Sequence, residues 1–167
     1  MTVLGRLLMV GAMALCVAGC TGAPGAGPPL VTGVTEGGLE IRPTHLEVSL
    51  GGFTGPSYRV ELQEDGRLLY LHNPESFTSA PGTRKRRIKV NDLQWRQFRG
   101  ALEEVGIWDW DEEYVDPEIL DGTQWLVRIR YEDAAVFSRG SNSYPPGRSF
   151  KRLRSAVQEL LGGREFR

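Results

Sequence analysis

The fold of this chain is best predicted from residues 58–71, which read YRVELQEDGRLLYL. Apolar and polar residues alternate over 58–62, a period of two that is typical of a strand with one buried face. Asp65-Gly66 has the composition of a two-residue type I′ turn, because glycine tolerates a positive φ angle. That turn pairs the strands so that Leu69 and Leu71 are expected on the buried face. The stretch therefore predicts a β-hairpin.

Further strands are expected on both sides of this hairpin. The same alternation occurs at 46–50 and again at 125–131, which a turn connects to 135–137. A short strand is also expected at 87–90. Closely linked strands favour antiparallel pairing.

Two segments instead repeat apolar residues at helical spacing. The first is capped by Asn91 or Asp92 and ended by Gly106, and the second ends at Gly162-Gly163. Their apolar faces consist of Trp95, Phe98, Leu102 and Val105, and of Phe150, Leu153, Val157 and Leu160. We therefore expect an α+β fold, with a mostly antiparallel sheet of about five to six strands and two amphipathic helices packed on one face.

Composition excludes several classes of protein. The chain has 167 residues, enough for one domain, and a formal charge of −1. This balance excludes a polycation built to neutralise many phosphates, so no nucleic-acid partner is expected. Two cysteines and two histidines leave little material for a soft-metal site. We predict no metal and no cofactor.

The N-terminus has the features of a targeting signal. After Arg6, the apolar run over 7–18 spans about 18 Å as a helix, too short for a hydrocarbon core of about 30 Å but suited to a signal peptide. The run ends in Val17-Ala18-Gly19-Cys20, which resembles the lipobox of bacterial lipoproteins. The resemblance implies cleavage before Cys20 and lipidation of its sulfur, usually followed by acylation of the new amine, typically with palmitate. The alternative is an ordinary secretory signal that leaves Cys20 as a free thiol.

The lipobox divides the chain into three parts. Residues 1–19 are expected to be the signal peptide, 20–38 the lipidated cysteine with a Gly/Pro-rich tether, and 39–167 a single α+β domain. The alternative for the tether is a strand near 30–34. Cys16 would be removed with the signal, so the mature domain would lack a free thiol. Thr21 follows the cysteine, which in lipoproteins of Gram-negative bacteria implies the outer membrane, facing the periplasm.

The sequence offers no catalytic motif. The acidic segment 103–121 lacks the glycine and glutamate that an EF-hand loop starting at Asp109 would need. A solvated acidic loop is preferred, with a different oxygen-ligand metal site around Asp116 and Asp121 as the alternative. The basic run 84–87 is expected to be a solvated hairpin end, with contact to anionic lipids or glycans as the alternative. His45 and His72 stand in no spacing that indicates a Ser–His pair, so we assign no catalytic residue.

Some polar and aromatic residues are not required by the core pattern. Trp108 and Trp110 are expected to share one side of an extended segment and to pack in the core rather than line a cleft. If a pocket exists, its candidate residues lie in the loops after Trp110 and before the last helix. They are Asp116, Asp121, Trp125, Ser141, Asn142 and Tyr144.

Residues 45–161 resemble an uncharacterised domain family found in bacterial lipoproteins and other exported proteins. The resemblance depends on short motifs, namely Gly55-Pro56-x-Tyr58, Asp65-Gly66-Arg67, Trp108-x-Trp110, Asp121-Gly122-x-x-Trp125 and Gly140-Ser141-Asn142-x-Tyr144-Pro145. It implies no activity, ligand or catalytic residue. We therefore expect a lipid-anchored protein of the bacterial envelope that acts as a non-catalytic interaction or binding module. Its partners would be the membrane, through the anchor, and an envelope protein or glycan. The alternatives are a hydrolase acting on cell-wall material and a small enzyme inhibitor.

Overall fold

The computed structural model describes residues 40–52, 54–119 and 121–167. The predicted signal peptide, Cys20 and the predicted tether therefore lie outside the described residues. In chain order the elements are β1 (His45–Gly52), β2 (Ser57–Leu62), β3 (Leu68–Asn73), β4 (Arg84–Ile88), α1 (Asp92–Glu104), the 3₁₀ helix η1 (Ile107–Asp109), β5 (Glu113–Val115), β6 (Thr123–Arg130), β7 (Ala135–Ser141) and α2 (Ser149–Leu160).

One mixed sheet organises the domain. Its strand order is β4-β3-β2-β1-β6-β7-β5, and every pairing is antiparallel except the parallel pair β5–β7. The α+β prediction is confirmed, with seven strands in place of the expected five to six. The acidic segment accounts for part of the difference, because it contributes the three-residue edge strand β5.

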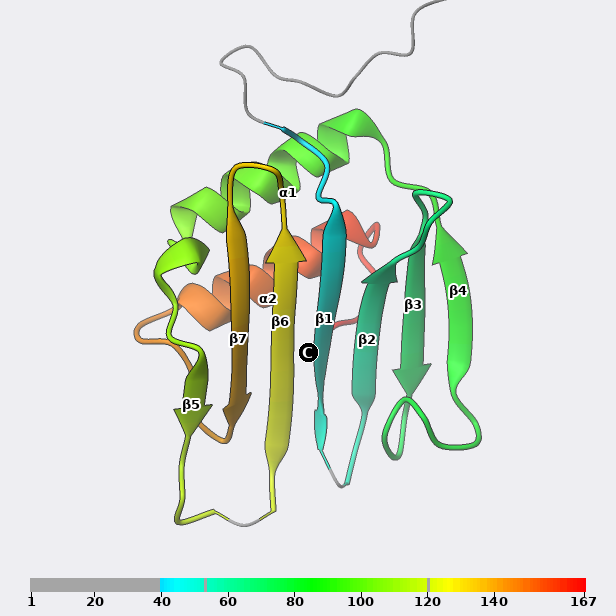
Figure 1. The fold of residues 1–167 in the computed structure, drawn as a ribbon. Helices are drawn as coiled ribbons and strands as arrows, with labels where there is room; N and C mark the ends of the chain where they lie inside the picture. Colours follow the sequence, from blue (N-terminus) through cyan, green and yellow to red (C-terminus); the bar gives the residue numbers. More distant parts are fainter. Residues whose placement is uncertain (1–39, 53, 120) are drawn as a thin grey trace, which may run out of the picture. The chain divides into compact units, whose positions relative to one another are not determined.

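Both helices lie against the same face of the sheet, and the other face is left open (Figure 1). The core fills the space between sheet and helices. Alternate strand residues such as Val60 and Val127 are fully buried there, as are Trp95 and Leu102 of α1 and Leu153 of α2. Burying each large apolar side chain contributes about 1.5–3 kcal/mol, so this layer supplies most of the stability.

The predicted helix ends are confirmed. The Asn91 side chain accepts from the Gln94 backbone N–H while the Gln94 side chain accepts from the Asn91 N–H, a capping box that satisfies two exposed donors of α1. Beyond α1, Gly106 adopts a left-handed φ of 61°. Gly162 does the same beyond α2, with a φ of 69°.

The predicted register of the β2–β3 hairpin is wrong by one residue. The backbone N–H of Gly66 donates to the Gln63 carbonyl at 2.9 Å, and Gly66 has a φ of 74°. The loop is therefore a three-residue turn with a glycine bulge and not a two-residue type I′ turn. Because side chains alternate between faces, Leu68 and Tyr70, rather than Leu69 and Leu71, face the core.

The basic run is also misplaced in the prediction. It forms β4, Arg84–Ile88, and not a hairpin end before a strand at 87–90. This strand lies at one edge of the sheet, where its four exposed cationic side chains discourage pairing with another chain.

The two tryptophans after α1 do not share one extended segment, because only Trp110 has an extended backbone. Trp108 belongs to η1, and both it and Trp110 are half-buried against the core. The rings of Trp108 and Tyr131 meet edge to face at 6.0 Å, and Trp110 meets Trp125 in the same way at 6.1 Å. Their assignment to the core is confirmed.

The C-terminal residues close the core beside β2 and β3. Phe166 is buried, with its ring 5.7 Å from that of Tyr58. The Tyr70 hydroxyl donates to the Glu165 carbonyl at 2.8 Å. Burial raises the pKa of Tyr70 to about 12, so its hydroxyl remains a hydrogen-bond donor at neutral pH.

Candidate ligand-binding site

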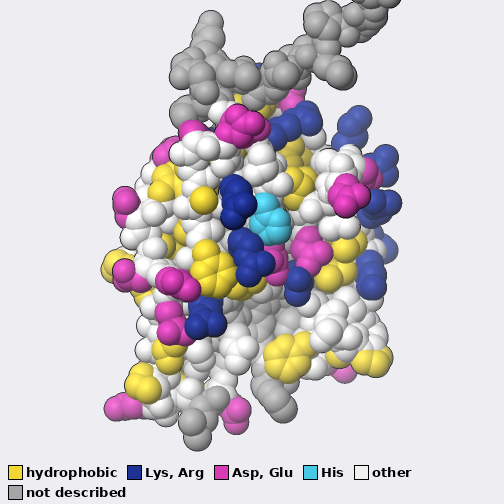
Figure 2. Space-filling view, viewed as in Figure 1, with side chains coloured by type: hydrophobic (Ala, Val, Ile, Leu, Met, Phe, Trp, Pro, Cys, Tyr) yellow, Lys and Arg dark blue, Asp and Glu magenta, His cyan; other side chains and the backbone are white. Residues whose placement is uncertain are grey.

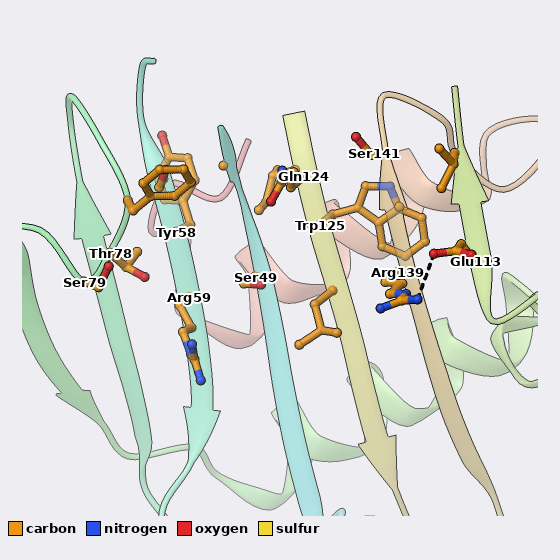
Figure 3. Close-up of a pocket in the computed structure, with 17 residues that line it drawn as sticks. Ser49, Tyr58, Arg59, Thr78, Ser79, Glu113, Gln124, Trp125, Arg139 and Ser141 are labelled. Carbon is orange, nitrogen blue, oxygen red and sulfur yellow. Dashed lines mark ion pairs between the residues drawn. The ribbon is translucent and has the colours of Figure 1, made fainter. Parts of the chain in front are cut away.

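A cavity of about 500 Å³ crosses the open face of the sheet, and we call it the open-face cavity (Figure 3). Strands β2, β1, β6 and β7 form its floor. The β3–β4 loop closes one end and β5 the other. The side chains that line it and are labelled in Figure 3 are Ser49, Tyr58, Arg59, Thr78, Ser79, Glu113, Gln124, Trp125, Arg139 and Ser141.

The cavity is hollow because its floor carries small side chains. The small lining residues are Ser49 and Gly51 of β1, Ser57 of β2 and Ser141 of β7. Gly51 must lack a side chain, because a Cβ there would lie 2.1 Å from the Ser57 Oγ. The space-filling view shows a hollow on this face, lower in the picture than a group of Lys and Arg side chains at its centre (Figure 2).

The charged groups around the cavity are already paired. The Arg139 guanidinium donates to Glu113 at 2.9 Å across β7 and β5. Arg59 pairs with Glu61 and lies 2.9 Å from a carboxylate oxygen of Glu47, whose side chain is only 11% exposed. Arg128 reaches the same Glu47 at 3.2 Å. Each carboxylate on this part of the face thus has a guanidinium partner, and the rim presents donors and acceptors with little excess charge.

Several hydroxyl groups of the cavity, in contrast, have no hydrogen-bond partner among the described residues. Ser57 is 3% exposed, and its Oγ has no hydrogen-bond partner among the described residues. A buried hydroxyl without a partner costs about 1–3 kcal/mol, so this position is unfavourable for stability alone. Within the described part of the chain, the side chains of Ser49, Gln124 and Ser141 also make no hydrogen bond. These groups remain available to a ligand or to water.

Two of the six candidate pocket residues, Trp125 and Ser141, line the open-face cavity. The Trp125 indole is almost fully buried and donates through Nε1 to the Ser143 carbonyl at 2.9 Å. It packs within an aromatic cluster, with ring centroids 4.8 Å from Phe150 and 6.4 Å from Tyr144. Trp125 therefore supports the cavity wall from the core side.

The other four lie outside this cavity. Asn142 has a left-handed φ of 57°. Its side-chain amide accepts from the Thr123 N–H and donates to the Ile119 carbonyl, so it stabilises the loop before β6. Asp116 accepts from the Glu118 N–H at 3.1 Å in a local turn. Asp121 is exposed, and Tyr144 lines a different cavity at the end of the sheet.

Sequence reasoning missed most of the cavity lining. Arg59 and Ser49 could have been placed on the open face, because they alternate with the buried residues of their strands. Glu113 and the loop residues Thr78 and Ser79 carry no such signal, because only the strand order brings them to the two ends of the cavity.

The described residues contain no group of three or more histidine or acidic side chains able to hold a metal ion. Of the two histidines, His72 stacks on Tyr58 with ring centroids 4.9 Å apart, and His45 lies 4.0 Å from Glu47. Over the same part of the chain, no helix has the length and apolar character needed to cross a bilayer. Comparison with protein-family models and with curated proteins finds no match to this chain.

Proposed function

We propose that this is a lipid-anchored protein of the bacterial envelope that binds an uncharged polar ligand, without catalysis, in the open-face cavity. The observation that carries the proposal is the cavity itself, on the sheet face that the helices leave uncovered. Binding sites are concave, with a few polar groups converging on an otherwise apolar lining. Leu126, Val115 and Tyr58 supply apolar lining beside the serines.

The state of the charged groups supports an uncharged ligand. A charged ligand would have to compete with ion pairs already formed, such as Arg139–Glu113 and Arg59–Glu47. Hydroxyl groups both donate and accept hydrogen bonds, so the serines match the hydroxyl groups of a glycan.

The sheet architecture favours a glycan over a peptide. Strands β2, β1, β6 and β7 each pair on both sides, so their backbone groups are used within the sheet. A peptide crossing the cavity could not add to the sheet as a further strand, because that mode needs an exposed edge. A glycan requires only side-chain partners. The hydrolase and inhibitor alternatives remain predictions, and no specific contact among the described residues favours them.

Accessibility of the cavity in the native envelope tests this proposal. The sequence beyond Cys20 has no cysteine, and lipidation would convert Cys20 to an unreactive thioether. A single cysteine can therefore be introduced by Leu126→Cys in the cavity, which leaves the polar lining intact, with Leu93→Cys at an exposed position of α1 as the matched control. We expect maleimide labelling of the cavity cysteine to be about tenfold slower in the native envelope than in the purified protein, as for a site about 90% occupied.

The control cysteine should label at the same rate in both preparations. Equal labelling of the cavity cysteine in envelope and purified protein would contradict the proposal. Equal slowing of both cysteines would also contradict it, because that result indicates general shielding by the envelope and not occupancy of the cavity.

A further inference from the structure

A second cavity, of about 510 Å³, lies at the end of the sheet, and we call it the end cavity. It is bounded by the end of β1 and the residues that follow it, the start of β6, the loop before α2, the first turns of α2 and the C-terminal residue. Its lining includes Thr123, Tyr144, Phe150, Lys151, Arg154 and Arg167. It shares Leu50 and Gly51 with the open-face cavity but differs from it in charge.

The end cavity is strongly cationic. Lys151, Arg154 and Arg167 line it, and no acidic residue does so among the described residues. Arg167 pairs through Nε with Glu165. Neither Lys151 nor Arg154 forms an ion pair with any residue that the structure describes. The cavity thus contrasts with the open-face cavity, where each arginine has a carboxylate partner.

Among these three cations, Arg154 has a buried hydrogen-bond donor without an acceptor. It is partly buried, and its Nε is shielded from solvent with no hydrogen-bond acceptor in the described part of the chain. Lys151 stands three residues earlier on α2, which places two like charges on one helix face, an unfavourable pairing. The rings of Tyr144 and Phe150, 4.8 Å apart, lower the local polarity and so strengthen any charge interaction in the cavity.

An anion would relieve both the repulsion and the missing acceptor. The planar guanidinium of arginine donates in parallel to two oxygens of a carboxylate or phosphate, and a lysine adds a point charge. The Thr123 hydroxyl and the Tyr144 hydroxyl can supply neutral donors. We propose that the end cavity binds an oxyanion group, a phosphate or a carboxylate, through Arg154 and Lys151. The groups that would bind the oxyanion do not line the open-face cavity, so this proposal does not depend on the glycan proposed there.

The test uses the purified full-length protein in a neutral detergent, with inorganic phosphate as the probe. We expect phosphate to raise the thermal unfolding temperature and to shift the NMR signal of the Arg154 Nε–H. Arg154→Gln should weaken phosphate binding about tenfold or more, since it removes a charge-assisted hydrogen bond. Lys151→Gln, at an exposed position, should weaken it less and keeps the test valid if the Arg154 variant is poorly folded. Arg152→Gln is the matched control, on the same helix but outside the cavity.

A second experiment identifies whether the oxyanion is free or carried by a lipid. It replaces inorganic phosphate with vesicles of phosphatidylglycerol and compares them with vesicles of phosphatidylcholine. A shift of the Arg154 signal with free phosphate, or with the phosphatidylglycerol vesicles only, supports the oxyanion site and assigns the group to a free or a lipid-borne ligand. No shift with any probe would overturn the proposal. An equal loss of binding in Arg152→Gln would also overturn it, because the effect would then come from general positive charge.

Discussion

Replacing Gly140 by alanine is expected to lower the free energy of unfolding by about 3 kcal/mol. Gly140 lies opposite Trp125 in the β6–β7 pair, and the indole lies directly over it. A Cβ at this position would be 2.3 Å from the indole Nε1 and 2.4 Å from Cε2, far inside contact distance. The ring cannot easily move away, because Phe150 and Trp110 pack against it. Overpacking costs about 1–3 kcal/mol, and displacing the indole also breaks its hydrogen bond to Ser143, worth about 1 kcal/mol.

The control for this variant is the same substitution at Gly100. Gly100 is exposed on α1, and a Cβ there meets nothing within 4 Å. Because alanine is the better helix former, Gly100→Ala should raise the free energy of unfolding by about 0.5–1 kcal/mol. Urea unfolding followed by tryptophan fluorescence measures both variants. A loss below about 1 kcal/mol at Gly140 would show that the indole can relax, and would contradict the packing argument.

The second large effect is expected at Arg99, which joins α1 to the β6–β7 turn. Its guanidinium donates to both carboxylate oxygens of Asp133 at 3.0 Å and through Nε to Glu103 at 2.7 Å. It also lies over two aromatic rings, 4.3 Å from the Tyr131 centroid and 4.9 Å from that of Trp108. Burial alone would lower the pKa of Arg99, but hydrogen bonds and charge from Asp133, together with Glu103, raise it above its usual value, so the group stays charged.

Arg99→Met is therefore expected to lower the free energy of unfolding by about 2–3 kcal/mol. Charge-assisted hydrogen bonds contribute about 1.5–3 kcal/mol, and we take the lower part of that range because the Asp133 and Glu103 side chains are 38% and 43% exposed. The cation–π contacts add about 1 kcal/mol. Arg99→Lys should lose roughly half as much, because lysine keeps the charge but lacks the planar fork. Thermal or urea unfolding measures both variants.

Arg96→Met is the matched control, because Arg96 is exposed on the same helix. A change within about 0.5 kcal/mol is expected there. If Arg99→Met were equally neutral, the contacts of Arg99 with Asp133 and the two rings would contribute nothing to stability.

For the β2–β3 hairpin, the sequence pattern predicts the strands but not their register. Alternation in β2 and the glycine at position 66 are sufficient to predict two paired strands, and the structure confirms them. They do not distinguish a two-residue loop from a three-residue loop with a bulge, since Asp-Gly suits both. The pattern over 68–71 cannot decide the register either, because Leu68, Leu69 and Leu71 are all apolar and Tyr70 is compatible with either face. The register is decided by the fit of Leu68 and Tyr70 to the core.

The candidate site was harder to predict for a different reason. Its floor combines Ser49 and Ser57, from the consecutive strands β1 and β2, with Ser141, which is distant in the chain and joins them only through the strand order. Alternation can place such a serine on the open face of its strand, but it does not show which other strands lie beside it. Asn142 illustrates the converse case, because its polar side chain suggested a ligand site but instead secures the backbone of a loop.

The lipid that we propose on Cys20 would decide which ligands the domain can meet, because it would hold the domain near a membrane surface. Mass spectrometry of the N-terminal peptide from the native protein tests it most directly. We predict a peptide that begins at Cys20, carries diacylglycerol in thioether linkage and incorporates labelled palmitate, with all label lost in Cys20→Ala. An unmodified Cys20 thiol, or a chain that still carries residues 1–19, would contradict the proposed placement.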